Sequence, residues 1–106
     1  MMSDYYYILV DKIPVLASDI IEWGRWFETA DRTINRTEID TDETVSTVFL
    51  GLNHNFFSDG PPILFETMIF GGQHDQYTER YSTYEQAETG HNRIVEALMN
   101  GTLEIY

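Results

Sequence analysis

Two stretches of the chain, residues 45–52 and 63–70, are apolar at most positions, a pattern typical of strands that are buried on both faces. Polar residues interrupt them at Ser46, Thr47, Glu66 and Thr67. We expect these stretches to form the two central strands of a sheet. The segment between them, residues 53–62, is rich in Asn, Asp, Gly and Pro, which favours a long loop.

Weaker patterns predict further strands beside this central pair. β-Branched and aromatic residues at 5–10 and 13–17 indicate a strand followed by a short return strand. Residues 32–40 favour an edge strand, because charged residues are interleaved with Thr and Ile. In residues 77–82, Tyr77, Glu79 and Tyr81 alternate with Thr78, Arg80 and Ser82, as in a half-buried strand.

Apolar residues at helical spacing predict two helices. The first covers residues 19–30, with Ser18 as its expected N-cap. The second begins after Thr83, which has capping-box spacing to Gln86, and ends at Gly101, where a left-handed C-cap is expected. The apolar stripe of the second helix comprises Tyr84, Ala87, His91, Ile94, Val95 and Leu98.

The order of these elements predicts an α+β fold. Most connections are too short for parallel crossovers, so we expect a mostly antiparallel sheet of four to five strands with two helices packed on one face. The length of 106 residues suits one core, and we expect residues 1–106 to form a single domain.

The charge of the chain narrows the classes of partner. Eighteen acidic residues against six basic ones give a formal net charge of −12, which repels nucleic acid and anionic membranes. A basic surface on another protein is attracted instead, and a nucleic-acid-binding protein has such a surface. The same charge also serves solubility alone, and composition does not separate the two interpretations.

The sequence also favours a reducing compartment. There is no cysteine for disulfides or thiolate ligands, no uninterrupted apolar run of membrane-spanning length, and no basic leader in the first ten residues. We therefore expect a cytoplasmic, unexported protein.

Three segments together resemble a group of small uncharacterised bacteriophage and prophage proteins. The segments are VSTVFLGLNHNF at residues 45–56, GPPILFETMIFGG at 60–72 and RYSTYEQAETGH at 80–91, a little under half of the chain. The resemblance implies a viral origin, and with it the cytoplasm of the host cell. Small acidic phage proteins often look like inhibitors of host defence, of the anti-CRISPR or anti-restriction type. The resemblance supplies no catalytic residue.

A metal site is one enzymatic alternative. Its candidate ligands are His54, His74, Asp75, His91 and Glu66, but their spacing matches no metal motif. His91 lies on the apolar stripe of the second helix, where a hydrogen-bonded core histidine is the more common outcome. We therefore assign no metal ligand and expect no cofactor.

Acid catalysis by Glu66 is a second alternative, since a carboxyl within an apolar strand is one setting for a catalytic acid. A structural ion pair with Arg80 on a neighbouring strand is the favoured interpretation. Gly71 and Gly72 lack the further glycines and lysine of a phosphate-binding loop, and we interpret them as a turn. No catalytic residue is assigned.

Display of acidic side chains is the most informative feature. One group lies on or beside the first helix and another lies within residues 38–43, and carboxylates on one face would imitate phosphate charge. A solvated surface is the alternative. The helix also carries more aromatic rings than one side holds, so Trp26 is a candidate partner anchor. The predicted partner-binding residues are Glu22, Trp26, Glu28, Asp31, Glu38, Asp40, Asp42 and Glu43.

These observations favour a binding protein over an enzyme. The leading hypothesis is an inhibitor that binds the basic surface of a host defence or nucleic-acid-handling protein, with DNA mimicry as one mode. A small metal-dependent hydrolase or nucleotide-binding protein is the first alternative. A structural protein that associates with itself, as in a homodimer, is the second.

Overall fold

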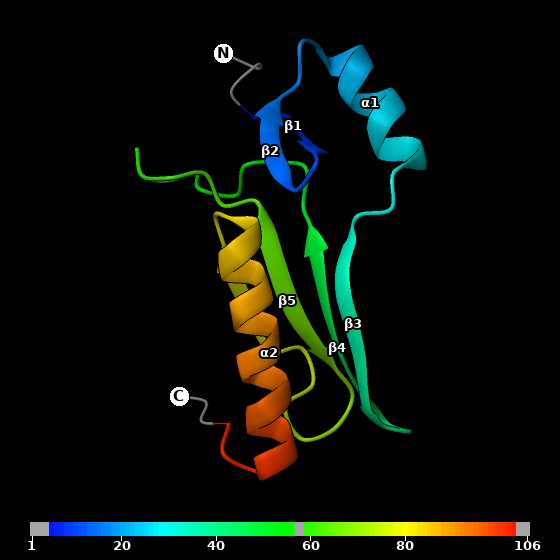
Figure 1. The fold of residues 1–106 in the computed structure, drawn as a ribbon, viewed down its shortest axis with the longest axis vertical. Coiled ribbons are helices and arrows are strands. Elements are labelled where there is room, and N and C mark those ends of the chain that lie inside the picture. The colour runs from blue at the N-terminus through cyan, green and yellow to red at the C-terminus, as the bar shows by residue number, and fades with distance from the viewer. Residues whose placement is uncertain (1–4, 57–58, 104–106) are drawn as a thin grey trace.

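A computed structural model describes residues 5–56 and 59–103 (Figure 1). The order of elements is ββαββββα, as the sequence patterns predict. The bounds are β1 Tyr7–Val10, β2 Ile13–Leu16, α1 Ile20–Thr29, β3 Thr33–Asp40, β4 Glu43–Phe49, β5 Phe65–Phe70, β6 Thr78–Tyr81 and α2 Tyr84–Asn100. No helix among the described residues is long and apolar enough to cross a membrane.

Four of the strands form one antiparallel sheet in the order β3-β4-β5-β6. The two central strands are those predicted from the apolar stretches, and β3 lies at the edge as its interleaved charges indicate. The hairpin of β1 and β2 forms its own two-stranded sheet. The fold is therefore the predicted α+β class, with the strands divided between two sheets.

The helix α2 covers one face of the larger sheet and encloses the core (Figure 1). Alternate residues of β4 and β5 point toward it, and the cross-strand pair Val45 and Ile69 packs on Ile94 of α2. The residues between them, among them Val48 and Met68, point to the opposite face and are only half-buried. This alternation fits a sheet covered on one side.

The hairpin and α1 close one end of this core. Tyr7 and Leu9 pack on the buried cluster that contains Phe49 and Phe65, and Trp26 of α1 meets Phe49 edge to face at a ring distance of 5.7 Å. Both helices thus contact the same face of the sheet, α2 along its length and α1 at its end. No described residue of α1 is fully buried.

The caps of the helices match the sequence in all but one place. Thr83 and Gln86 form the predicted capping box and Gly101 adopts the left-handed conformation. The prediction of Ser18 as the N-cap of α1 is wrong, since Asp19 occupies that position and accepts the backbone N–H of Glu22 at 2.7 Å. An aspartate caps as well as a serine, and Ser18 instead donates its N–H to the Glu22 carboxylate.

Candidate functional site

A pocket of about 440 Å³ opens where the C-terminal end of α2 meets the end of the sheet that carries the β3–β4 turn. Three segments far apart in sequence line it. The turn between β3 and β4 contributes Asp40, Asp42 and Glu43; the loop after β5 contributes Gly72, Gln73 and His74; and the end of α2 with the residues after it contributes Ala97, Leu98, Gly101 and Leu103.

Turn chemistry fixes the acidic wall of this pocket. The Asp40 carboxylate accepts the backbone N–H of Asp42 at 2.8 Å, which closes the tight turn between β3 and β4. Gly71 and Gly72 lie against this turn with φ of 84° and 71°, and a Cβ on either would clash with Asp42 or Glu43. The two glycines therefore form the predicted turn, and only glycine lets the loop approach the Asp42 backbone carbonyl and the Glu43 carboxylate so closely.

The backbone of α2 adds to the negative potential of the pocket. The C-terminal end of a helix carries a partial negative charge, and the last turn of α2 holds no basic residue to offset it. The backbone N–H groups of Gly101 and Thr102 satisfy the carbonyls of Leu98 and Ala97. The field of the helix end thus combines with the charges of three carboxylates.

The basic residues of the chain lie away from this pocket, and none of the six is among its lining residues. Within the described part of the chain, no ion pair involves Asp40, Asp42 or Glu43. The ion pairs present are Arg36–Glu38, Arg80–Glu66 and Arg93–Glu79, and Arg32 lies over the ring of Phe27 while donating to the Phe49 carbonyl. The pocket therefore has no lysine or arginine counter-ion among the described residues.

Glu38 and the three acidic residues near α1 lie elsewhere. Glu38 pairs with exposed Arg36 at 3.3 Å on the face of the sheet opposite α2. The Glu22 carboxylate accepts the backbone N–H of Ser18, Asp31 accepts the backbone N–H of Thr33, and Glu28 is exposed. Figure 1 places α1 and the β3–β4 turn at opposite ends of a molecule 44 Å long, so the eight predicted residues do not form one continuous surface.

Trp26, the predicted anchor, is half-buried against Phe49. Trp23 and Phe27 are also half-buried, and the Trp23 indole N–H donates to the Gly51 carbonyl at 2.9 Å. The most exposed apolar side chains of α1 are instead Ile20 and Ile21 in its first turn. The aromatic rings of α1 thus attach the helix to the fold.

The residues considered for metal binding do not converge. No group of three or more His, Cys, Asp or Glu side chains among residues 5–56 and 59–103 is placed to hold a metal ion. Glu66 forms the predicted cross-strand ion pair with Arg80 at 2.8 Å, on the face opposite α2. His74 lines the acidic pocket, whereas His54 stacks near Phe56 in the loop after β4.

His91 is the buried, hydrogen-bonded core residue that its position on the apolar stripe predicts. Its side chain is fully buried between α2 and the sheet. One ring nitrogen contacts the Thr37 hydroxyl at 2.9 Å and the other contacts the Thr47 hydroxyl at 2.7 Å. Burial lowers the pKa of His91, so the neutral imidazole is favoured.

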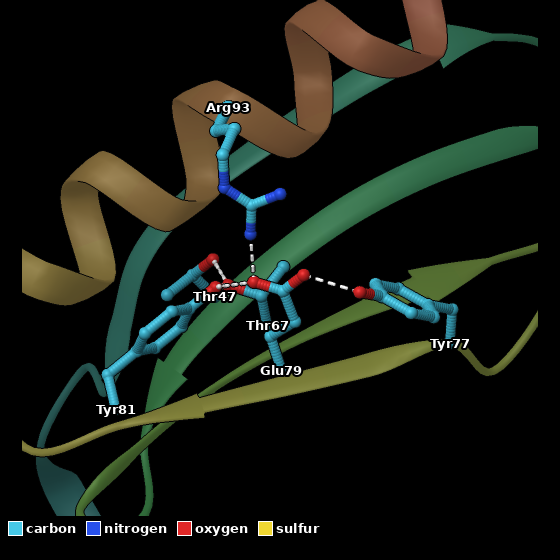
Figure 2. A network of polar contacts seen from close by, with 6 residues as sticks. All are labelled: Thr47, Thr67, Tyr77, Glu79, Tyr81 and Arg93. Atoms are coloured by element: carbon cyan, nitrogen blue, oxygen red, sulfur yellow. Dashed lines mark hydrogen bonds and ion pairs between the residues drawn. The ribbon is translucent and has the colours of Figure 1, made fainter. Parts of the chain in front are cut away.

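The contact of His91 with Thr47 continues into a polar network beneath α2. Figure 2 shows this network from Thr47 onward, without His91. Thr47 bonds Thr67, and Tyr81 donates to Thr67 at 3.1 Å. Figure 2 shows Arg93 reaching from α2 to Glu79, which also accepts the hydroxyl of Tyr77. No buried side-chain nitrogen or oxygen in the described residues lacks a partner. We interpret the network as what holds α2 in register on the sheet.

Chemically, the pocket suits a cation and disfavours an anion. Phosphate groups of a nucleotide would meet three carboxylates and a negative helix end, with no donor from Lys or Arg. Ala97, Leu98 and Leu103 add an apolar wall beside the charges. An arginine or lysine side chain has both properties this lining requires, an aliphatic stem and a positive head.

The sequence singles out Asp40, Asp42 and Glu43 as partner-binding candidates, His74 only as a candidate metal ligand and Gly72 only as a turn residue. Leu98 reads as part of the core stripe, and Gln73 and Leu103 carry no pattern of their own. Comparison with protein-family models, with curated proteins and with solved structures yields no match.

Proposed function

We propose that this chain is a binding protein that receives a basic side chain of a partner protein in its acidic pocket. The observation that supports this most strongly is the gathering of Asp40, Asp42 and Glu43 around one pocket at the negative end of α2. Like charges placed together with no lysine or arginine beside them repel each other, and a bound cation relieves that repulsion.

An arginine suits this lining better than a free metal ion. Its planar guanidinium donates to carboxylates in pairs, and its apolar stem packs against Leu98 and Leu103. A partner protein with a basic surface would also be attracted from a distance by the net charge of −12. The pocket then sets the position of docking, while the overall charge raises the rate of encounter.

Inhibition of a host defence or nucleic-acid-handling protein is the biological role we propose for this docking. Such proteins use arginine and lysine to bind phosphate, and a carboxylate pocket that occupies one of these residues competes with nucleic acid. This mode needs only the end of the molecule around the β3–β4 turn. It does not need a continuous acidic surface that copies a DNA backbone.

The test is titration calorimetry with a short arginine-rich peptide as the probe. We expect the variant Asp40→Asn/Asp42→Asn/Glu43→Gln to bind at least about tenfold more weakly, because each change removes a charge-assisted hydrogen bond. The Asn at position 40 keeps the oxygen that accepts the Asp42 N–H, so the turn is preserved.

The matched control is Glu28→Gln/Glu85→Gln/Glu88→Gln, which removes the same number of charges from exposed helix positions. It should change the affinity by no more than about threefold, through the general attraction alone. Equal losses in the two variants would show that peptide binding depends on diffuse charge, and the pocket proposal would be rejected.

A further inference from the structure

The hairpin of β1 and β2 exposes an apolar face. Its cross-strand pairs alternate between two sides, and Tyr7 and Leu9 on the inner side pack on the core. The pairs Val10–Ile13 and Ile8–Val15 point to the other side. We call these four β-branched residues the hairpin outer face.

Three of the four residues are strongly exposed, Ile13 by 63%, Val10 by 50% and Val15 by 42%. An antiparallel sheet that faces water on one side normally carries polar residues there. Ile20 and Ile21, in the first turn of the following helix, are exposed as well. The four residues of the hairpin outer face are neighbours across and along the two strands, and a contiguous apolar surface of this kind marks an interaction site.

Charge indicates what covers this face. Asp11 and Lys12 are the only charged residues in positions 5–18, so this segment has no net charge within a chain of −12. Two copies of so acidic a chain repel each other at most other surfaces. A basic partner would be attracted by carboxylates. The hairpin outer face has none, so it suits a second copy of the chain better than a basic partner.

We propose that the hairpin outer face is the contact surface of a homodimer, in which the hairpins of two copies stack face to face. An aliphatic surface is complementary to itself, as a two-fold symmetric interface requires. This inference is independent of the acidic pocket, because Figure 1 places the β3–β4 turn, which lines that pocket, at the opposite end of the molecule from the hairpin.

Stacking of faces, rather than pairing of strand edges, follows from the register of the hairpin. Val10 and Ile13 flank the two-residue turn at Asp11 and Lys12, where both turn residues have positive φ. Pro14 follows Ile13 in β2 and pairs with Leu9. Hydrogen-bonded and non-hydrogen-bonded pairs alternate along an antiparallel ladder, so the backbone of Pro14 faces the outer edge of β2, and its N–H is missing there. Pro14 therefore interrupts the edge that a second strand would need.

Sedimentation equilibrium of the full chain from about 5 μM to 1 mM tests this proposal over the affinity range of modest dimers. We expect a reversible dimer that strengthens as sodium chloride is raised, because salt screens the repulsion between two acidic copies. A chain that stays monomeric throughout, or self-association that weakens with salt, would overturn the proposal.

The variant Ile13→Glu should weaken the dimer by more than about tenfold, since the symmetric contact carries two copies of the change. Met99→Glu is the matched control, because Met99 is 64% exposed on α2 and the added charge is the same. Equal weakening by both variants would contradict the proposal. Ile13→Thr keeps the β-branched shape, so it should weaken the dimer without unfolding the hairpin; an unchanged dimer in this variant would also contradict it.

Discussion

Replacing Phe49 with alanine should lower the free energy of unfolding by about 3–5 kcal/mol, the usual cost of truncating a buried aromatic ring. Phe49 is fully buried at the end of β4 and packs on Phe65 with a ring distance of 5.3 Å. Its ring also receives Trp26 of α1, so it joins that helix to the sheet and α2. This loss is a large part of the free energy of unfolding of a typical domain, which is about 5–15 kcal/mol. Urea denaturation measures it.

Phe70→Ala is the control for this prediction. Phe70 ends the neighbouring strand β5 but is 50% exposed, so its truncation should cost only about 1 kcal/mol. A similar cost for the two variants would mean that Phe49 does not lie at the junction we describe. We also expect Phe49→Ala to loosen α1, which a change in tryptophan fluorescence at low urea would detect.

Replacing Glu79 with alanine should cost about 2 kcal/mol, because the hydroxyl of Tyr77 and the guanidinium of Arg93 lose their shared charged acceptor. Burial alone would raise the pKa of Glu79, but hydrogen bonds from Arg93, Tyr77 and Tyr81 hold it below its ordinary value. The ionised carboxylate therefore stabilises the fold above about pH 4.5, and this contribution is lost as the pH falls further through the lowered pKa.

The difference in free energy of unfolding between wild type and Glu79→Ala, measured by urea denaturation, should thus shrink in acid. The hydrogen bond to Glu79 is also the main reason that the pKa of Tyr77 is raised to about 12, so tyrosinate absorbance should show that pKa falling in the variant. Glu79→Gln keeps a hydrogen-bond acceptor without the charge, so its free energy of unfolding should lie between those of wild type and Glu79→Ala. A difference that is constant with pH would argue against an ionised Glu79 in the network.

Local patterns were enough to predict the order of elements. The period-two spacing of strands and the 3.6-residue spacing of helices can both be recognised from residues that are close together in sequence. The interleaved charges that predict β3 as an edge strand and the capping of α2 at Thr83 are local signals of the same kind. The Glu66–Arg80 pair and buried His91 also followed, since one needs only adjacent strands and the other only a helix face.

The site was predicted less completely, because it depends on where distant segments meet. Asp42, His74 and Leu98 come together only through the closing of the sheet on α2, and no spacing along the chain records that approach. The same holds for Glu79. The alternating pattern around it predicts a strand, but nothing in that pattern predicts its contact with Arg93 on α2. Acidic residues near α1 and in the β3–β4 turn looked equivalent in sequence, and the fold separates them.

Amide NMR spectra of the isotope-labelled chain, recorded during titration with the arginine-rich peptide, test the central claim residue by residue. We predict that the largest shifts occur at Asp42, Glu43, His74 and Leu98, around the acidic pocket. Glu28 in α1 and Asp31 just after it carry the same charge, and Figure 1 places α1 at the other end of the molecule, so both should shift little. Shifts of equal size at the two ends, or shifts confined to α1, would contradict binding in the pocket.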